Sequence, residues 1–353
     1  MPPGLPAPLR VGLAGYGPAG SFFHAPLIAA TPGLRLSAVV TRDAAKAERV
    51  RREHPGAEVV ESAGELWGRA DLVVVATPNR THVPLATEAL KAGLPVVVDK
   101  PLAGTAGEAR ELLRLAHDHG LMLSVFQNRR WDGDFLTLRR LLPRLGRVHR
   151  FESRFERWRP APKGGWRETG GPDDLAGTLY DLGSHLVDQA LQLFGPVSRV
   201  YAEADVRRAG VLADDDAFIS LTHESGTRSQ LWMSAVAGRL GPRFRVLGSD
   251  SAYVKWGLDP QEEGLRAGER PTAGIPWGAE PPERWGQLGA EGEEPTAVPT
   301  EPGAYQRFYE GVVACLRDGA PAPVTVESVV ETLAVLEAAR LSAANGQVVS
   351  LRG

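Results

Sequence analysis

Short apolar runs alternate with helical segments through the first third of the chain, and this alternation restricts the fold more than any other feature. The runs Leu72–Ala76 and Val96–Val98 are continuously apolar, as strands buried on both faces must be. Further strand candidates span Leu9–Ala14, Leu36–Thr41 and Leu121–Phe126. Because parallel strands need helical crossovers, this repetition predicts a doubly wound parallel sheet, a Rossmann domain, over residues 1–125.

After Phe126 the chain changes character, since longer strand candidates replace the short buried runs. These candidates span Val148–Trp158, Val197–Val206, Ala217–Thr222, Ser229–Ala235 and Phe244–Leu247. The tripeptide Glu224–Gly226 is typical of a hairpin turn between two of them. Residues 126–353 are therefore expected to form a second, α+β domain with a large, mainly antiparallel sheet that binds substrate and mediates oligomerisation.

Local signals delimit helices and one long loop. Thr105 and Glu108 form a T-x-x-E capping box. Gly93 and Gly120 occupy positions typical of the residue that ends a helix. Residues 257–304 are rich in glycine, proline and glutamate, which predicts a long loop of the functional or mobile kind.

Composition narrows the class of protein and its partners. The formal net charge is −3, so no bulk field favours nucleic acid or an anionic membrane. No stretch approaches the roughly 18 apolar residues of a membrane span. Cys315 is the single cysteine, which excludes an intrachain disulfide and favours a reducing compartment. We therefore expect a cytoplasmic protein with no nucleic-acid partner, no membrane partner and no metal site.

A G-x-G-x-x-G motif lies at Gly15–Gly20, between the first strand candidate and a helical segment. Glycine lets the backbone turn tightly and approach a pyrophosphate, which then meets the N-terminus of a helix. The alternative is a glycine-rich turn without a ligand, which the strand–turn–helix context disfavours. The motif predicts a dinucleotide site that includes Gly15, Tyr16, Gly17 and Gly20.

The end of the second strand candidate distinguishes NADP from NAD. A site for NAD usually places Asp or Glu there, against the ribose hydroxyls. In this chain Thr41 and Arg42 occupy the position, and Asp43 follows them. An arginine can pair with a 2′-phosphate, so NADP is expected as the cofactor. The alternative is that Arg42 is a solvated side chain and Asp43 binds the ribose of NAD.

Two further segments carry candidate catalytic groups. Lys100 follows a buried strand candidate, at the sheet edge where open α/β sheets bind ligands; the alternative is a surface lysine. The bond before Pro101 is a candidate cis peptide.

In Tyr180–Asp188, Asp181 and His185 share one face if the segment is helical. A carboxylate can orient an imidazole and raise its basicity, and histidine titrates near neutrality; the alternative is a structural histidine.

Together these motifs resemble the family named for glucose–fructose oxidoreductase, inositol dehydrogenase and the rhizopine catabolism protein (Gfo/Idh/MocA). The segments that carry the resemblance are GLAGYGPAG at 12–20, ATPNRTH at 76–82, ALKAGLPVVVDKP at 89–101 and YDLGSHLVD at 180–188. The sequence is most similar to the branch of NADP-dependent scyllo-inositol dehydrogenases. That similarity rests on FHAPLI at 23–28, NRRWDGDF at 128–135, GWRE at 165–168, GTLYDLGSHLVDQ at 177–189 and LRAG at 265–268.

The resemblance implies roles for the catalytic candidates and an assembly. It implies that Lys100 contacts substrate and helps in proton transfer. His185 is the implied acid/base, and Asp181 the residue that binds or orients substrate. The second domain of the family has an open, mostly antiparallel sheet that often mediates dimers or tetramers, so a homodimer or homotetramer is expected.

The resemblance also implies cofactor contacts. The segment with Thr77, Pro78, Asn79 and His82 is expected along the cofactor. Asp99 stands where glutamate is usual in the family, so its side chain is one methylene shorter and its cofactor contacts can differ.

The substrate pocket is expected to use indole and guanidinium groups. An indole face can stack on the apolar face of a polyol ring, and arginine can donate to hydroxyls. The candidates are Arg130, Trp131, Trp166, Arg167 and Tyr180. The alternative for each tryptophan is packing in the core.

These expectations combine into an NAD(P)-dependent dehydrogenase of a cyclic polyol or sugar, in the first instance the scyllo-inositol/inosose pair with NADP. Two alternatives remain open. One is an aldose or other sugar dehydrogenase of the same family, because a fold does not determine a substrate. The other is a non-catalytic regulator that senses the nucleotide. Lys100, Asp181 and His185 argue against a sensor, which needs no acid/base pair.

Overall fold

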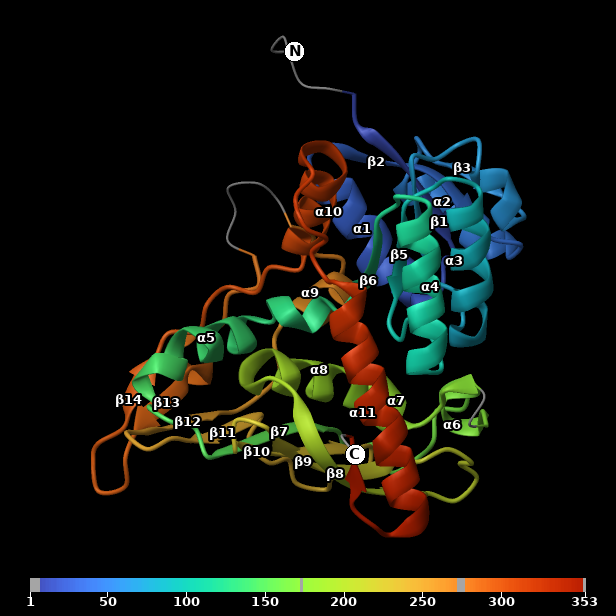
Figure 1. Ribbon diagram of the computed structural model, residues 1–353. Coiled ribbons are helices and arrows are strands. Elements are labelled where there is room, and N and C mark those ends of the chain that lie inside the picture. The colour runs from blue at the N-terminus through green and yellow to red at the C-terminus, as the bar shows by residue number, and fades with distance from the viewer. Residues whose placement is uncertain (1–6, 172–173, 272–276, 352–353) are drawn as a thin grey trace.

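A six-stranded parallel sheet organises the first part of the chain, in a computed structural model that describes residues 7–171, 174–271 and 277–351. Its strand order is β3-β2-β1-β4-β5-β6. The strands are β1 (Leu9–Ala14), β2 (Leu34–Val40), β3 (Glu58–Val60), β4 (Leu72–Val75), β5 (Val96–Asp99) and β6 (Leu123–Phe126). Helices cover both faces, with α1 and α10 on one side and α3 and α4 on the other (Figure 1). This burial on both faces explains the continuous apolar runs in β4 and β5.

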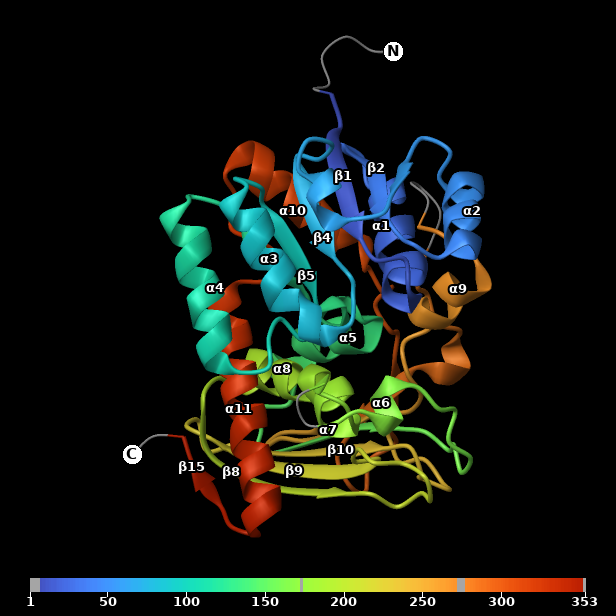
Figure 2. The ribbon, with the colours of Figure 1, turned by 90° about the vertical axis from the view of Figure 1, so that its right-hand side faces the viewer.

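A nine-stranded sheet forms the second layer, in the order β14-β13-β12-β11-β7-β10-β9-β8-β15. Its neighbours pair antiparallel except β7 and β10, which are parallel. The strands are β7 (Arg150–Glu156), β8 (Val197–Asp205), β9 (Asp216–His223), β10 (Arg228–Ser234), β11 (Phe244–Leu247), β12 (Ala252–Lys255), β13 (Gly286–Gly289), β14 (Thr296–Val298) and β15 (Val349–Ser350). Buried residues alternate along β9, because helices cover one face of the sheet, the face toward the parallel sheet (Figure 2).

The helices connect and separate these two sheets. They are α1 (Ala25–Ala30), α2 (Ala44–Glu53), α3 (His82–Lys91), α4 (Ala106–Asp118), α5 (Gly133–Leu141), α6 (Trp166–Thr169), α7 (Thr178–Asp181), α8 (Gly183–Phe194), α9 (Gln261–Ala267), α10 (Gln306–Asp318) and α11 (Val326–Asn345). A π-helical turn, η1 (Ala19–His24), precedes α1, and the short 3₁₀ turns are η2 (Ala63–Leu66), η3 (Asn79–Thr81), η4 (Asn128–Trp131), η5 (Leu142–Arg144) and η7 (Pro282–Arg284). The predicted fold class, a doubly wound parallel sheet plus a large, mostly antiparallel sheet, is confirmed.

Local sequence signals placed several boundaries correctly. Thr105 accepts a hydrogen bond from the Glu108 amide, and the Glu108 carboxylate returns to the Thr105 amide, which completes the capping box of α4. Gly93 and Gly120 follow α3 and α4 with positive φ angles of 79° and 64°. The hairpin predicted at Glu224–Gly226 joins β9 to β10.

The last two helices tie the halves of the molecule together. Helix α10 packs Phe308, Tyr309 and Val312 into the core of the parallel sheet. Helix α11 contributes Leu333 to that same core and Leu336 to the core of the nine-stranded sheet. Figure 1 shows α11 running from one sheet to the other. The end of the chain therefore holds the two layers in a common packing unit.

Two sequence expectations were wrong. The short strand β3 was not foreseen, because three residues of mixed exposure carry little pattern. Residues 257–304 were expected to be loop, but they contain α9, β13 and β14, which extend the second sheet. This segment is anchored by a fully buried ion pair, in which Lys255 Nζ lies 3.1 Å from a carboxylate oxygen of Glu280. Burial of a charge requires such a partner.

We predict that Glu280→Ala lowers the free energy of unfolding by about 3–5 kcal/mol, because the Lys255 ammonium is left buried without its carboxylate. Urea denaturation followed by circular dichroism measures the change. Glu283→Ala is the matched control, since Glu283 is exposed, and its effect should stay within about 0.5 kcal/mol. Equal stability of the two variants would show that the ion pair does not anchor this segment.

Candidate active site

The turn after β1 needs glycine at three positions for three physical reasons. Gly15 has φ +101°, and a Cβ there would lie 2.7 Å from the carbonyl oxygen of Ala76. A Cβ on Gly20 would lie 2.1 Å from the carbonyl oxygen of Gly15, so η1 packs directly on the turn. A Cβ on Gly17 would meet nothing within 4 Å. The open space at Gly17 is where the backbone of a dinucleotide-binding turn lets a pyrophosphate approach, so the turn fits that group.

The side chain of Tyr16 points away from this open space, toward α2. Its ring is buried beneath the guanidinium of Arg49, with 5.6 Å between Cζ and the ring centroid. Its hydroxyl donates to a Glu53 carboxylate oxygen at 3.0 Å. Tyr16 therefore offers the turn its backbone, while its side chain holds α2 against the turn.

The residues after β2 present a cation and use their carboxylate elsewhere. Asp43 caps α2 and accepts a hydrogen bond from the Lys46 amide at 3.0 Å, and this bond lowers the pKa of Asp43. Thr41 Oγ1 accepts from the Asp43 amide at 3.2 Å. Arg42 is exposed, and only its Nε has a hydrogen-bond partner among the described residues, the Glu61 carbonyl at 3.1 Å. The guanidinium end of Arg42 therefore stays available.

His82 connects the loops that follow β4 and β5. Its Nδ1 lies 2.7 Å from the Pro101 carbonyl oxygen, and its Nε2 lies 2.9 Å from the Thr77 carbonyl oxygen. The imidazole is buried, whereas Thr77, Pro78 and Asn79 are at least partly exposed at the same sheet edge as the glycine turn. His82 thus positions the segment that the sequence predicted to lie along a cofactor.

Lys100 reaches from the end of β5 to the second layer of the molecule. The Lys100–Pro101 peptide is cis, in agreement with the sequence expectation. The Nζ of Lys100 donates to Asp181 Oδ1 at 3.0 Å and also to the Asp181 carbonyl oxygen. The structure therefore brings together two of the three predicted catalytic residues, from segments 81 residues apart.

The segment with Asp181 and His185 is not one continuous helix as expected, because it breaks at Leu182 between α7 and α8. In a continuous helix the Asp181 carbonyl would accept from the His185 amide. Instead, the His185 amide donates to the Leu182 carbonyl at 3.1 Å, and the Asp181 carbonyl accepts from Lys100. Lysine thus takes the place of a helical hydrogen bond, and the Asp181 carboxylate pairs with that lysine.

His185 is a neutral, buried base. It is only 6% exposed, and its Nδ1 has no hydrogen-bond partner within the described part of the chain. Burial, and then the positive charges of Lys100, Arg129, Arg243 and Arg157, lower the pKa of His185 well below its usual range. The imidazole is therefore unprotonated near pH 7 and able to accept a proton.

Asp99 faces a buried pair behind Lys100. Its carboxylate lies 3.6 Å from His24 Nε2, and His24 Nδ1 lies 2.6 Å from the Tyr309 hydroxyl. Burial raises the pKa of Asp99, but His24, His82 and Lys100 more than offset this, so the net shift is downward. The carboxylate of Asp99 is thus ionised where it faces His24, behind Lys100.

The structure places three of the expected pocket residues in packing roles. Arg130 donates to Asp188 at 2.6 Å and to Ser328 at 2.8 Å, which joins η4 to α8 and α11. Trp131 packs on the core of the parallel sheet, with its ring 5.8 Å from that of Phe308. Tyr180 is buried beside Arg340. The side chains of Trp166 and Arg167 lie outside the described part of the molecule.

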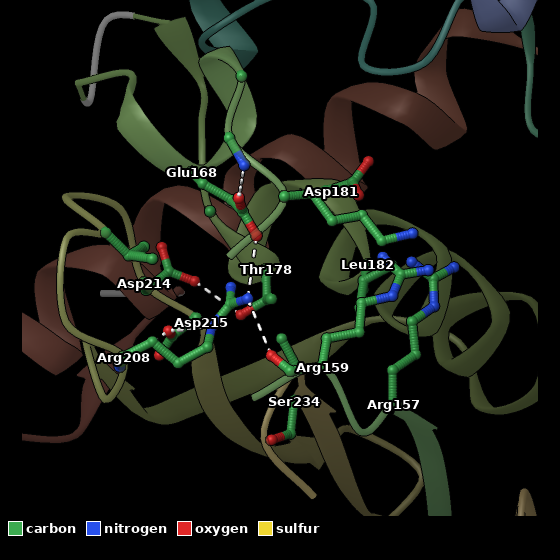
Figure 3. Close-up of a pocket in the computed structure, with 16 residues that line it drawn as sticks. Arg157, Arg159, Glu168, Thr178, Asp181, Leu182, Arg208, Asp214, Asp215 and Ser234 are labelled. Carbon is green, nitrogen blue, oxygen red and sulfur yellow. Dashed lines mark hydrogen bonds and ion pairs between the residues drawn. The ribbon is translucent and has the colours of Figure 1, made fainter. Parts of the chain in front are cut away.

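Sequence reasoning missed the arginines of a cavity of about 200 Å³ next to Asp181 (Figure 3). Arg157 and Arg159 extend from the end of β7, and Arg208 from the turn after β8. Arg208 is neutralised by Asp215 at 2.8 Å and Glu168 at 3.0 Å. The R-W-R pattern at 157–159 was the available signal, since alternate residues of a strand share a face.

Two absences hold for the residues that the structure describes. No group of three or more His, Cys, Asp or Glu side chains there is placed to hold a metal ion. No helix in that part of the chain is long and apolar enough to cross a membrane.

Comparison with known proteins follows the same division into two parts. Residues 9–127 match the oxidoreductase family with an NAD-binding Rossmann fold, and residues 140–351 match the C-terminal α/β domain of that family. The first match supports an NAD(P) site at the glycine turn. The two matches together cover both sheets.

Full-length relatives include enzymes of polyol and sugar metabolism. The chain is 36% identical to scyllo-inositol 2-dehydrogenase (NADP(+)) of Bacillus subtilis, over 97% of this chain and 96% of the relative. It is 42% identical to the uncharacterised oxidoreductase YdgJ of Escherichia coli, over 93% and 94%. The solved structure of the oxidoreductase YvaA from Bacillus subtilis superposes with a TM-score of 0.92 at 35% identity, covering 98% of this chain and 99% of that one.

We predict that Gly17→Ala raises the Kd for NADPH on the order of tenfold or more, since the new methyl group occupies the space a phosphate needs for its backbone hydrogen bonds. The melting temperature should change little, because a Cβ there meets nothing within 4 Å. Titration of NADPH fluorescence and thermal unfolding measure the two quantities. Gly56→Ala, also in open space, is the control; unchanged NADPH affinity in Gly17→Ala would refute the cradle.

Proposed function

The chain belongs to the Gfo/Idh/MocA oxidoreductase family, and from this premise we propose that it is an NADP-dependent dehydrogenase of a cyclic polyol or sugar. The scyllo-inositol/inosose pair is the substrate pair to test first, given the relative in Bacillus subtilis. The observation that carries the proposal is the Lys100–Asp181 ion pair at the carboxyl end of β5, beside the neutral His185. Open α/β sheets bind ligands at that edge.

The Gly15–Gly20 turn and the Thr77–Asn79 segment would hold NADP, which would supply the hydride acceptor of this reaction. His185 receives the proton of the hydroxyl group as the carbinol C–H bond breaks, and a carbonyl forms. The low pKa of His185 keeps the imidazole in its accepting form. In the reverse direction the protonated imidazole returns that proton to the carbonyl oxygen.

Lys100 stabilises the oxygen on which negative charge develops. Its ammonium carries three N–H donors, and two are directed at the carbonyl and carboxylate of Asp181. The third is available to a substrate hydroxyl. Asp181 therefore orients Lys100, and the break at Leu182 exposes the carbonyl that does so.

The preference for NADP rests on the residues after β2. Asp43, the only acid of the Thr41–Asp43 segment, has its carboxylate committed to capping α2. Arg42 presents a guanidinium end to solvent at the same point. A 2′-phosphate is the group that such a cation pairs with, and an unphosphorylated ribose lacks it.

Arg42→Ala is expected to lower the preference for NADP over NAD, expressed as the ratio of kcat/KM values, about tenfold or more through loss of a charge-assisted hydrogen bond. Initial rates with both cofactors measure it. Arg52→Ala, an exposed arginine of α2, should leave the ratio unchanged. A constant ratio in Arg42→Ala would instead support a solvated Arg42 and ribose binding by Asp43.

The reaction itself is tested with NADP or NAD and a panel of scyllo-inositol, myo-inositol, glucose and xylose, by the absorbance of reduced cofactor. We expect reduction of NADP, with scyllo-inositol above the other three. His185→Ala and Lys100→Ala should each lower kcat by about 10²-fold, the scale of a lost general acid or base. His149→Ala, an exposed histidine, is the control.

Near-normal rates in both site variants would contradict the assigned roles. Tight NADPH binding without turnover of any polyol or sugar would favour a non-catalytic, nucleotide-sensing protein.

A further inference from the structure

Two arginines from one strand end share the cavity beside Asp181. The Arg157 amide donates to the Ser234 carbonyl at 2.8 Å, and the Arg159 amide to the Ala235 carbonyl at 2.8 Å. Their backbone is therefore held by the sheet, and their side chains, two residues apart, project to the same side. Figure 3 shows the two guanidinium groups side by side near Leu182, below Asp181.

Neither guanidinium has a carboxylate within ion-pair distance among the described residues. Arg157 lies over the ring of Phe155, 4.8 Å from its centroid, and is half-buried. Arg208, in the same cavity, shows the contrasting case, since two carboxylates neutralise it. Among the described residues, Arg157 and Arg159 thus lack the carboxylate partners that Arg208 has.

The nearby acids do not cancel this charge. Asp181 is paired with Lys100 at 3.0 Å, and Glu262 is paired with Arg129 at 2.5 Å. Asp214 accepts hydrogen bonds from the Thr178 hydroxyl and the Leu179 amide, and burial raises its pKa. Lys163 adds a further positive charge to the lining.

The cost of this arrangement is visible in Arg157. Burial lowers the pKa of Arg157, and the like charge of Arg159 lowers it further, against the opposing effects of Glu262 and Asp181. Two neighbouring cations in a partly buried cavity destabilise each other unless an anion joins them. Planar guanidinium groups match the geometry of a carboxylate or a phosphate, to which they donate two parallel hydrogen bonds.

We propose that Arg157 and Arg159 form an anion subsite, so that the preferred substrate is a polyol or sugar with a carboxylate or phosphate group. This inference rests on the proposed function, because the same cavity borders Asp181 and thereby Lys100. The anionic group of the ring would lie on the arginines while the carbinol carbon faces Lys100 and His185. Neutral inositols and aldoses would occupy the site without filling the subsite.

The test compares neutral substrates with anionic congeners. Glucose is paired with glucuronate and glucose 6-phosphate, and myo-inositol with inositol 1-phosphate. The expected result is a kcat/KM for a carboxylate or a phosphate congener that exceeds the neutral value on the order of tenfold or more, the scale of a charge-assisted hydrogen bond. The two congeners of glucose distinguish a sugar acid from a sugar phosphate.

Arg157→Gln and Arg159→Gln keep a polar side chain with hydrogen-bond donors, but the side chain is shorter and the charge is removed. Each should lower kcat/KM for the anionic substrate at least about tenfold more than for its neutral congener, mainly through KM. Arg199→Gln, an exposed arginine of β8, is the control and should leave the ratio unaltered. The Kd for NADPH should stay within about twofold, since neither arginine belongs to the proposed cofactor site.

A wild-type preference for the neutral congeners, or equal losses for both substrate classes in the variants, would overturn the anion subsite. A tenfold loss of NADPH affinity would overturn it too, by assigning the arginines to the cofactor. If no substrate turns over, the proposed function fails, and the subsite is judged separately. Glucuronate, glucose 6-phosphate or inorganic phosphate should then raise the melting temperature of the wild type but not of the double variant, and no such difference would reject the subsite.

Discussion

The contact of Lys100 with Asp181 is the interaction on which the rest of the site depends. It joins the carboxyl end of β5 to the junction of α7 and α8, and so brings the two layers together at the candidate active site. By accepting from lysine, the Asp181 carbonyl is withdrawn from the helical pattern, and α8 begins two residues later, at Gly183. The same contact therefore positions the lysine, orients the carboxylate and sets the start of the helix that carries His185.

Burial, and then a surrounding network of charges, explains the neutral state of His185. Arg129 pairs with Asp132 and Glu262, and Arg243 pairs with Asp134. Each arginine thus has a carboxylate partner, which a buried charge requires. Their positive charge, added to that of Lys100, makes a protonated imidazole costly. The environment thus keeps the imidazole unprotonated, and no hydrogen bond between this ring and a described carboxylate is found.

The network also shows how the described residues between 257 and 304 are anchored despite their loop-like composition. Asp259 accepts from the Gly133 amide at 2.7 Å, and Gln261 donates to the Trp131 carbonyl at 3.1 Å. Burial and then the charge of Asp134 raise the pKa of Asp259 to about 6. Buried polar groups of this segment thus find their partners on η4 and α5. The resulting contacts connect this segment, which continues into the outer strands β13 and β14, to η4 and α5.

The sequence by itself determined the elements whose signal is local. Continuous valine runs revealed the parallel strands. The spacing of Gly15, Gly17 and Gly20 revealed the turn, because backbone sterics demand glycine at Gly15 and Gly20. The position of Lys100 after a buried strand was enough to predict that it lies at the carboxyl edge of the parallel sheet. Only the tertiary structure decided which side chains from distant segments meet at the candidate site. It paired Asp181 with Lys100, directed Arg130 and Tyr180 into packing, and left Arg157 and Arg159 without acid partners among the residues that the structure describes. Such outcomes depend on which distant side chains meet in space, and neither periodicity nor spacing along the chain carries that information.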